Sequence, residues 1–338
     1  MIPGGCHAKV AAPDLISSLR TIFPMIDEKD FQDCHSISVP GVGLDIESSV
    51  DLIYDMNLGL YVLGYVAVVH SLSDVFAALA DPFSVLWVAG FPSREPLSAL
   101  TELVTGAVDA MNDHRLQFGG GHSVASETAF LSVTSLGTRQ GRAALEREVE
   151  YALIVTKKLG SGLGIAGARE GLLTDVEAGQ LVASMKTSNA LASREASRLA
   201  QRGDVGFATD ITGFGLLYGL KTQLDSGWRA VVSVADVPVW DFARRLLEEE
   251  ALCTVLGERN WFEMREASSG PSGVSWEDGL LLSDPQTSGG LLVAVKASAV
   301  HEFTDQVDSY VIGTIDYCPE NAGLLLSVNK ERYESQET

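Results

Sequence analysis

The chain reads ATDITGFGLL over Ala208–Leu217 and SDPQTSGGLL over Ser283–Leu292. In the first stretch Asp210 stands beside a glycine-containing turn, and the second runs into an apolar strand pattern at Leu291–Val295. An α/β fold presents its ligand-facing groups at strand ends and in the adjoining turns. The two stretches therefore predict an α/β fold that holds Asp210 where it can face a ligand.

Strand and helix patterns alternate on both sides of these stretches. Ser36–Val50 alternates apolar and polar residues around a Pro-Gly turn, which predicts a hairpin with Asp51 just past its second strand. Apolar spacing and short apolar runs predict the other elements. Helices are expected at Leu63–Leu79, Pro96–Met111 and within Val176–Arg202, and strands at Ser84–Ala89, Ala129–Leu136, Tyr151–Thr156, Val231–Val234 and Leu291–Val295.

A length of 338 residues favours two domains. The charged stretch Thr138–Glu150 has no apolar period and contains the predicted boundary. Residues 1–28 mix glycine, proline and alanine with one short amphipathic stretch, and we expect this segment to be mobile. Residues 29–147 are predicted to form the first domain and residues 148–338 the second. The expected class is α/β with mixed sheets, and no repeat of about 20 to 50 residues indicates a solenoid or propeller.

The composition argues against several functions. Lys plus Arg number 24 against 45 Asp plus Glu, so the formal charge of −21 disfavours nucleic-acid and polybasic membrane binding. The most apolar run, Val62–Ala80, is about as long as a membrane span but carries His70 and Asp74, which predicts a buried helix. Four scattered cysteines indicate neither a disulfide framework nor a zinc site, and the N-terminus lacks a signal-peptide pattern. We expect a cytoplasmic protein.

Four aspartates are candidate metal ligands: Asp33, Asp51, Asp74 and Asp210. Any one of them alone is more commonly a helix cap or a turn residue. Together their carboxylates suit Mg²⁺, which prefers carboxylate oxygens and nucleotide phosphates. Such a cluster would let an acidic protein bind ATP as its magnesium complex. His70 stands four residues before Asp74, where a structural hydrogen bond is favoured over a metal pair.

Two glycine-rich segments are candidate phosphate-binding loops, because their backbone amides can approach an anion. They are Gly119-Gly120-Gly121-His122-Ser123 and Gly160-Ser161-Gly162, and neither is a P-loop or a dinucleotide fingerprint. A tight loop between elements explains each of them equally well. His122 either contacts substrate or caps its loop.

The N-terminal segment carries a reactive pair. Cys6 follows two glycines and stands three residues before Lys9, whose charge would lower the pKa of a nearby thiol. The pair is a candidate nucleophile or chalcogen carrier. An incidental N-terminal cysteine is the alternative.

Ala208–Leu217 and Ser283–Leu292 strongly resemble the signature segments of selenophosphate synthetase, also called selenide, water dikinase. Cys6 and Lys9 fall on that family's N-terminal pattern, a Cys or selenocysteine followed three residues later by Lys. Related kinases and cyclases of the same superfamily lack this pattern. The resemblance covers most of the chain and includes Ser71–Ala77, Gly120–Ser123, Thr156–Gly162 and Gly257–Asn260.

The resemblance implies the two-domain architecture of aminoimidazole ribonucleotide synthetase, a homodimer, and synthesis of selenophosphate, AMP and orthophosphate from ATP, selenide and water. Cys6 would hold or deliver selenium, and Lys9 would meet the phosphates. The four aspartates would hold Mg²⁺ ions that bridge the nucleotide phosphates. The implied ATP-contacting residues are Lys9, Asp51, Gly119, Gly120, Gly121, His122, Ser123 and Asn260.

Three positions depart from the family pattern. Gly59 and Tyr65 stand where the family has an acid and a base, and His70 replaces an asparagine. Two alternatives to an active synthetase follow. One is a non-catalytic paralogue with a binding or regulatory role, which the missing charges favour. The other is a different ATP-dependent small-molecule kinase of the superfamily, which explains the aspartates but not Cys6.

Overall fold

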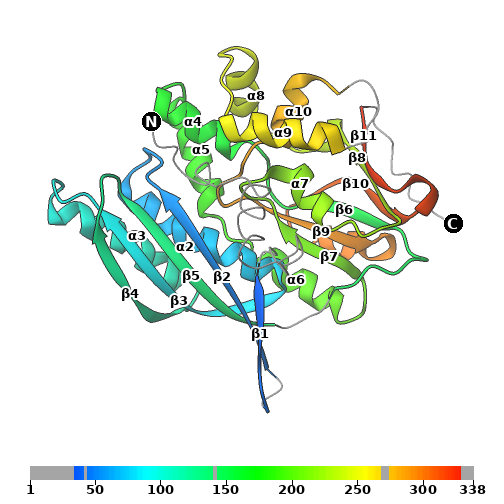
Figure 1. Cartoon of the computed structure of the whole chain (residues 1–338), viewed down its shortest axis with the longest axis horizontal. Helices are drawn as coiled ribbons and strands as arrows, with labels where there is room; N and C mark the ends of the chain where they lie inside the picture. Colours follow the sequence, from blue (N-terminus) through cyan, green and yellow to red (C-terminus); the bar gives the residue numbers. More distant parts are fainter. Residues whose placement is uncertain (1–33, 42–43, 140–142, 268–273, 329–338) are drawn as a thin grey trace, which may run out of the picture.

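A computed structural model describes residues 34–41, 44–139, 143–267 and 274–328. They form two mixed β-sheets, each with helices packed against it (Figure 1), so the predicted α/β class is confirmed. The first sheet has the strand order β1 (His35–Val39), β2 (Leu44–Tyr54), β5 (Phe130–Arg139), β3 (Ala80–Phe91) and β4 (Gln117–Ala125). The second has the order β11 (Gly323–Ser327), β8 (Trp228–Ser233), β10 (Tyr310–Tyr317), β6 (Tyr151–Val155), β9 (Leu291–Lys296) and β7 (Val205–Asp210).

The N-terminal hairpin is present, with β1 and β2 paired antiparallel. The expected position of Asp51 just past the second strand is wrong, because β2 continues to Tyr54. Pairing with β5 extends the strand: Asp51 lies opposite Val133, and Tyr54 lies opposite Phe130. The alternation of the sheet therefore sets the direction of the Asp51 side chain.

Helix α2 (Leu60–Ala77) is the central helix of the first half. It packs against β2, β3 and β5 on one side and against α3 (Leu97–Asp113) on the other. The two helices approach closely at Gly64, where an added Cβ would lie 1.9 Å from the carbonyl oxygen of Leu103. By length and composition α2 could span a membrane, but 78% of it is buried inside the protein. The prediction of a buried helix is confirmed.

The second half alternates helices with its strands. The single helical stretch expected within Val176–Arg202 is two helices, α5 and α6, because the chain is extended at Thr187 and turns at Asn189. Short 3₁₀ turns lie at Val234–Asp236, Ala297–Ala299 and Pro319–Asn321. The α-helices are α4 (Ser161–Glu170), α5 (Asp175–Lys186), α6 (Ala190–Ala200), α7 (Gly215–Thr222), α8 (Asp241–Glu248), α9 (Val255–Ala267), α10 (Trp276–Leu282) and α11 (Val300–Thr304).

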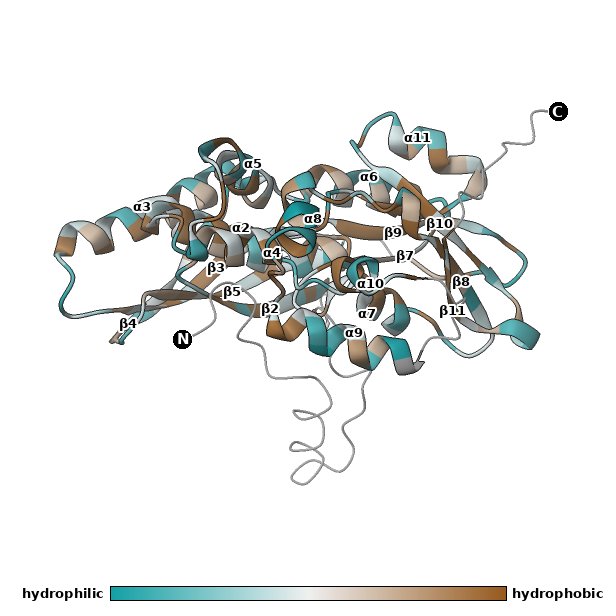
Figure 2. Cartoon of the chain, turned by 90° about the horizontal axis from the view of Figure 1, so that it is seen from above, coloured by the Kyte–Doolittle hydropathy of each residue, from teal (hydrophilic) through white to brown (hydrophobic). Residues whose placement is uncertain are grey.

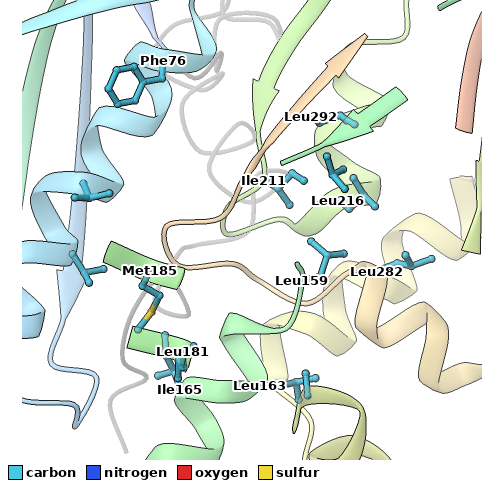
Figure 3. Packing of buried hydrophobic residues seen from close by; sticks show 14 of the residues in the cluster. Phe76, Leu159, Leu163, Ile165, Leu181, Met185, Ile211, Leu216, Leu282 and Leu292 are labelled. Carbon is cyan, nitrogen blue, oxygen red and sulfur yellow. The ribbon is translucent and has the colours of Figure 1, made fainter. Parts of the chain in front are cut away.

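One apolar core runs from the first half into the second. Helix α2 contacts α5 and β7, and the buried cluster includes Phe76, Met185 and Ile211 (Figure 3). Strand β9 consists largely of hydrophobic residues, drawn in brown, whereas the outer turns are largely hydrophilic (Figure 2). The shared core holds the loops that follow β7 and precede β9 near α2.

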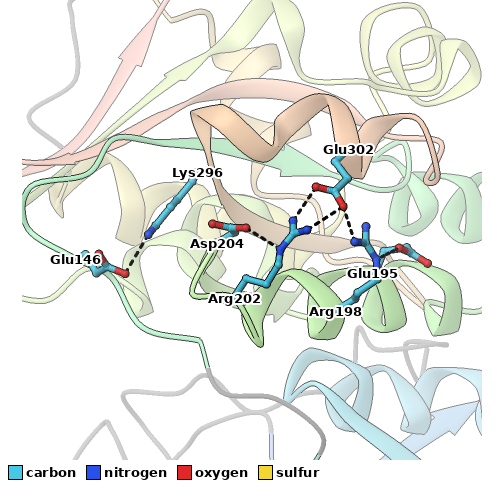
Figure 4. A network of polar contacts seen from close by, with 7 residues as sticks. All are labelled: Glu146, Glu195, Arg198, Arg202, Asp204, Lys296 and Glu302. Carbon is cyan, nitrogen blue, oxygen red and sulfur yellow. Dashed lines mark hydrogen bonds and ion pairs between the residues drawn. The ribbon is translucent and has the colours of Figure 1, made fainter.

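A network of ion pairs joins α6, α11 and the start of β7 on the surface (Figure 4). Glu302 accepts hydrogen bonds from Arg202 and Arg198, which lower the pKa of its carboxyl to about 2. Arg202 also contacts Asp204, and Lys296 pairs with Glu146 at 3.1 Å. Because each pair has at least one side chain that is 42% or more exposed, each pair adds little stability by itself. We assign the network to the scaffold.

Candidate functional site

Two of the predicted aspartates of the first half lie at the contact between β2 and α2. Ser49 and Asp51 point to the same face of β2, because side chains alternate along a strand. Ser49 donates its hydroxyl hydrogen bond to the carboxylate of Asp74, and His70 Nε2 lies 3.8 Å from Asp51 Oδ1. His70 and Asp74 are one helical turn apart. The fold thus brings Asp51 and Asp74 into neighbouring positions between strand and helix.

Asp210 is the last residue of β7 and is 4% exposed. Half-buried Lys157 lies beside it and donates from Nζ to the carbonyl oxygens of Thr187 and Ser288. Loss of hydration lowers the pKa of Lys157 to about 7, and the negative charge of Asp210 opposes that shift. Asp210 therefore lies at a strand end beside a lysine, and its contact with a ligand stays a prediction.

The two glycine-rich stretches of the second half lie against each other. Ile211 N–H donates to Gly290 O at 2.9 Å, and Gln286 N–H donates to Thr212 O at the same distance. Gly289 is required there, because a Cβ would lie 2.0 Å from the carbonyl oxygen of Ile211. The stretches are distant in sequence but form one structural unit behind Asp210.

Asn260 lies at the same junction. It is 4% exposed, and its Nδ2 donates to Gly213 O and Ser283 O, both at 3.1 Å. The side-chain amide thus ties one glycine-rich stretch to the other. A contact of Asn260 with ATP stays a prediction.

The same unit contacts the first half of the molecule through Ser288, which has φ of 52°. Its N–H donates to His70 Nδ1 at 3.0 Å, and its carbonyl accepts from Lys157 at 2.8 Å. Next to it, Asn189 Nδ2 donates to Ser73 Oγ and Gly289 O, both at 2.9 Å. A single loop therefore lies between the Asp51 side and the Asp210 side of the candidate site.

The prediction of a phosphate-binding loop at 160–162 is wrong as a loop, because Ser161 begins α4 and Gly160 is its N-cap. The amides at this helix start already have partners. Gln286 Oε1 accepts from Gly160 N–H and Ser161 N–H, and Asp284 Oδ2 accepts from Gly162 N–H and Leu163 N–H. The Asp284 carboxylate thus occupies the position that an anion would take at a helix N-terminus.

Burial raises the pKa of Asp284 to about 7, against the hydrogen bonds that favour its charged form. An acid whose pKa is raised on folding stabilises the fold below its ordinary pKa, and this contribution is lost as pH rises through about 7. We therefore compare the free energy of unfolding in urea for the natural chain and for Asp284→Asn. As the pH rises from about 5.5 to 8, the value for the natural chain should fall by about 2 kcal/mol relative to the variant. Asp241→Asn, at an exposed helix start, is the control. Parallel pH profiles of the natural chain and Asp284→Asn would contradict the assignment.

The second predicted loop, Gly119–Ser123, is also wrong as a loop. These residues lie inside β4, an edge strand that pairs in parallel with β3 and places His122 opposite Val88. Three consecutive glycines favour a turn locally, but pairing with β3 overrides this preference. His122 and Ser123 are exposed on the strand, and their role as ATP-contacting residues stays a prediction.

Other predicted site residues fall elsewhere. Cys6, Lys9 and Asp33 lie outside the described residues. Within the described ranges, no group of three or more His, Cys, Asp or Glu side chains is placed to hold a metal ion. Asp51 and Asp74 lie on the side of the Ser288 loop that His70 contacts, and Asp210 lies on the side that Lys157 contacts.

Family models match nearly the whole chain. Residues 32–138 match the N-terminal domain of AIR synthase related proteins, and residues 148–320 match the C-terminal domain. A selenide, water dikinase from Bdellovibrio bacteriovorus is 30% identical over 304 residues, which cover 86% of this chain and 85% of the relative. The chain belongs to the selenide, water dikinase family. Another family member, from Agathobacter rectalis, is 29% identical and covers 90% of both chains.

Solved structures of other AIR synthase-like proteins share the fold. Thiamine monophosphate kinase from Aquifex aeolicus has a TM-score of 0.66 at 15% identity, covering 94% of this chain and 98% of the other. HypE from E. coli has a TM-score of 0.63 at 18% identity, covering 93% of each chain. The two-sheet architecture is therefore a fold that this chain shares with both proteins.

Two departures from the dikinase pattern lie near α3. Gly59 is the N-cap of α2 with φ of 94°. Tyr65 donates from its hydroxyl to Asp113 at 2.6 Å, and Lys186 Nζ lies 4.1 Å from its ring centre. Nine residues separate Tyr65 from Asp74, which places them on opposite sides of α2. Tyr65 thus packs toward α3 and α5 and not toward the aspartates.

Sequence reasoning missed several residues that assemble this dikinase-type site. Lys157 lies in the family segment Thr156–Gly162, but the sequence analysis predicts no role for it. No composition or spacing pattern marks Asn189 or Ser288 as a site residue. Their importance comes from contacts with residues about a hundred or more positions away. The one local signal is the Ser288-Gly289-Gly290 turn within a family signature.

Proposed function

We propose that this chain is an enzyme that makes selenophosphate, AMP and orthophosphate from ATP, selenide and water. The observation that carries the proposal is the match to curated selenide, water dikinases along almost the whole of both chains. The N-terminal Cys6 and Lys9 agree with it. We retain the division into residues 1–28, 29–147 and 148–338 as a proposal.

The chemistry of the described carboxylates fits magnesium-bound ATP. Mg²⁺ commonly takes only one or two protein carboxylates and completes its shell with water and substrate phosphates, so a group of three is not required. Asp51, Asp74 and Asp210 would hold the ions, together with Asp33. When bound, the metal neutralises charge on the phosphates. Lys157 would add a positive charge beside Asp210.

The N-terminal segment would supply the selenium chemistry. In this proposal the Cys6 thiolate holds or delivers selenium, and Lys9 meets the phosphates. A cytoplasmic location is part of the proposal, because the four cysteines are scattered along the sequence without the spacing of a disulfide framework.

A phosphorus NMR spectrum of the purified chain with ATP, Mg²⁺ and selenide tests the reaction. The expected products are selenophosphate, AMP and orthophosphate, with AMP release dependent on selenide. No turnover would favour a non-catalytic paralogue. ADP formation with another phosphate acceptor would favour a different kinase of the superfamily.

We also propose a homodimer that buries the face of the first sheet opposite α2, a face that none of the described helices covers. Helix α2 packs on one face, whereas Val50, Leu52 and Val88 are 64%, 37% and 38% exposed on the other. Leu52, Ser132, Val88 and His122 form one row across the strands. A solvated sheet face is normally polar, so an exposed apolar face indicates a partner surface. A second copy of this chain is the proposed occupant.

We expect Val50→Lys combined with Leu52→Lys to convert the dimer into a monomer, because two buried charges would face each other across the two-fold interface. Size-exclusion chromatography with light scattering measures the mass. Val176→Lys, at a 71% exposed position on α5, is the control and should remain dimeric. A natural chain that is monomeric at micromolar concentration would contradict the proposed interface.

A further inference from the structure

His70 is fully buried and contacts both halves of the molecule. Its Nδ1 accepts a hydrogen bond from Ser288 N–H at 3.0 Å, and its Nε2 lies 3.8 Å from Asp51 Oδ1. Ser288 belongs to the loop before β9, whereas Asp51 belongs to β2. One imidazole ring therefore spans from the second half to a candidate metal-binding carboxylate of the first.

The hydrogen bond from Ser288 sets the tautomer of this ring. A backbone N–H can only donate, so Nδ1 must be the unprotonated acceptor, and a neutral ring then carries its proton on Nε2. That N–H faces Asp51. The ring thus places a polar N–H 3.8 Å from the carboxylate oxygen, a distance longer than a direct hydrogen bond, and the orientation of the ring depends on the position of Ser288.

The Ser288 loop is itself held in place from several directions. Lys157 donates to its carbonyl, and Asn189 ties the neighbouring Gly289 carbonyl to Ser73 on α2. Ser288 is 3% exposed and adopts positive φ, which few residues other than glycine adopt. The loop can therefore act as a fixed support for the ring.

We propose that His70 is a positioning residue that orients Asp51 for metal binding and makes this orientation depend on the docked Ser288 loop. Its role in the reaction rests on the proposed function, whereas its coupling to Asp51 does not. Outer partners of metal-ligating side chains orient those ligands, and their loss typically weakens metal affinity about 10-fold to 100-fold. The polar N–H that His70 presents toward Asp51 is the contact through which it would act.

Two substitutions separate the two contacts of the ring. Asn places an amide oxygen near the position of Nδ1 and keeps an acceptor for Ser288, but it does not reach Asp51. Gln reaches toward Asp51 with an amide donor but leaves Ser288 N–H without its acceptor. We expect His70→Asn to weaken Mn²⁺ binding about 10-fold or more with a nearly unchanged melting temperature. We expect His70→Gln to bind Mn²⁺ within about threefold of the natural chain and to melt at a lower temperature.

Electron paramagnetic resonance titration with Mn²⁺ alone measures the affinity, and thermal melts measure stability. Ser193→Ala is the matched control, because Ser193 Oγ donates to Phe76 O across the same interface but away from Asp51. It should lower stability and leave Mn²⁺ affinity unchanged. Equal Mn²⁺ affinity in the natural chain and His70→Asn would overturn the proposal.

A stability cycle of His70→Asn, Asp51→Asn and the double variant tests the coupling without any metal or substrate. Each variant changes the equilibrium constant of unfolding by some factor. We expect the factor for the double variant to differ by more than about threefold from the product of the two single factors. Independent effects would overturn the inference even in an active enzyme. A coupled pair in a chain that makes no selenophosphate would leave the inference standing and remove the proposed function.

Discussion

Asp210→Asn should lower selenide-dependent AMP release by at least about 100-fold, because it removes a full negative charge from a site that must hold divalent cations. The loss also removes the group that supports the positive charge of Lys157, so the pKa of that lysine should fall further. Steady-state turnover measured over a range of Mg²⁺ concentrations provides the test. Thermal melts should show that the variant still folds.

Asp241→Asn serves as the matched control for Asp210→Asn. Asp241 is an exposed aspartate at the start of α8 in the same half of the chain, and its loss removes one charge without touching the site. Turnover of this control should remain within about twofold of the natural chain. If Asp210→Asn keeps normal magnesium-dependent turnover, Asp210 only caps the turn after β7.

Cys6→Ser should abolish selenide-dependent product formation while ATP binding and the melting temperature stay close to those of the natural chain. A hydroxyl is a far weaker nucleophile than a thiolate and a poor carrier of selenium, whereas most residues of the proposed nucleotide site lie elsewhere in the chain. Phosphorus NMR measures selenophosphate, and calorimetry with a non-hydrolysable ATP analogue measures binding.

Cys253→Ser is the control for a general effect of losing a thiol, because Cys253 is exposed and lies at a distance in sequence from the N-terminal segment. It should retain activity. A Cys6→Ser protein that makes selenophosphate from free selenide at the normal rate would remove Cys6 from the proposed chemistry.

Local patterns predicted seven of the eleven described strands, but of the described helices they predicted only α2, α3 and the stretch that contains α5 and α6. The hairpin of β1 and β2 follows from alternating residues around Pro40-Gly41, and α2 follows from an apolar run too long for a strand. The signature Ala208–Leu217 predicted a glycine-containing turn beside Asp210, and in the structure Asp210 ends β7, a strand that was not predicted. These features were accessible because their signals are contained within short stretches of chain.

The predictions of two glycine-rich loops were wrong because they considered only residues that are neighbours in sequence. Gly119–Ser123 favours a loop when only neighbours in sequence are considered, but β3 supplies hydrogen-bond partners along its length. Gly160–Gly162 has free amides only until Asp284 and Gln286 fold onto them. In both cases a partner distant in sequence decides the conformation.

The sequence by itself determined the fold class, the family and the kinds of side chain available for the chemistry, because periodicity and short signatures are local properties. The tertiary structure alone decided how those side chains are combined. It placed His70 between Asp51 and Ser288, and it set Lys157 beside Asp210. Such contacts depend on loop closure over long stretches of chain and on the packing of α2 against the second half, and no short pattern of residues encodes them.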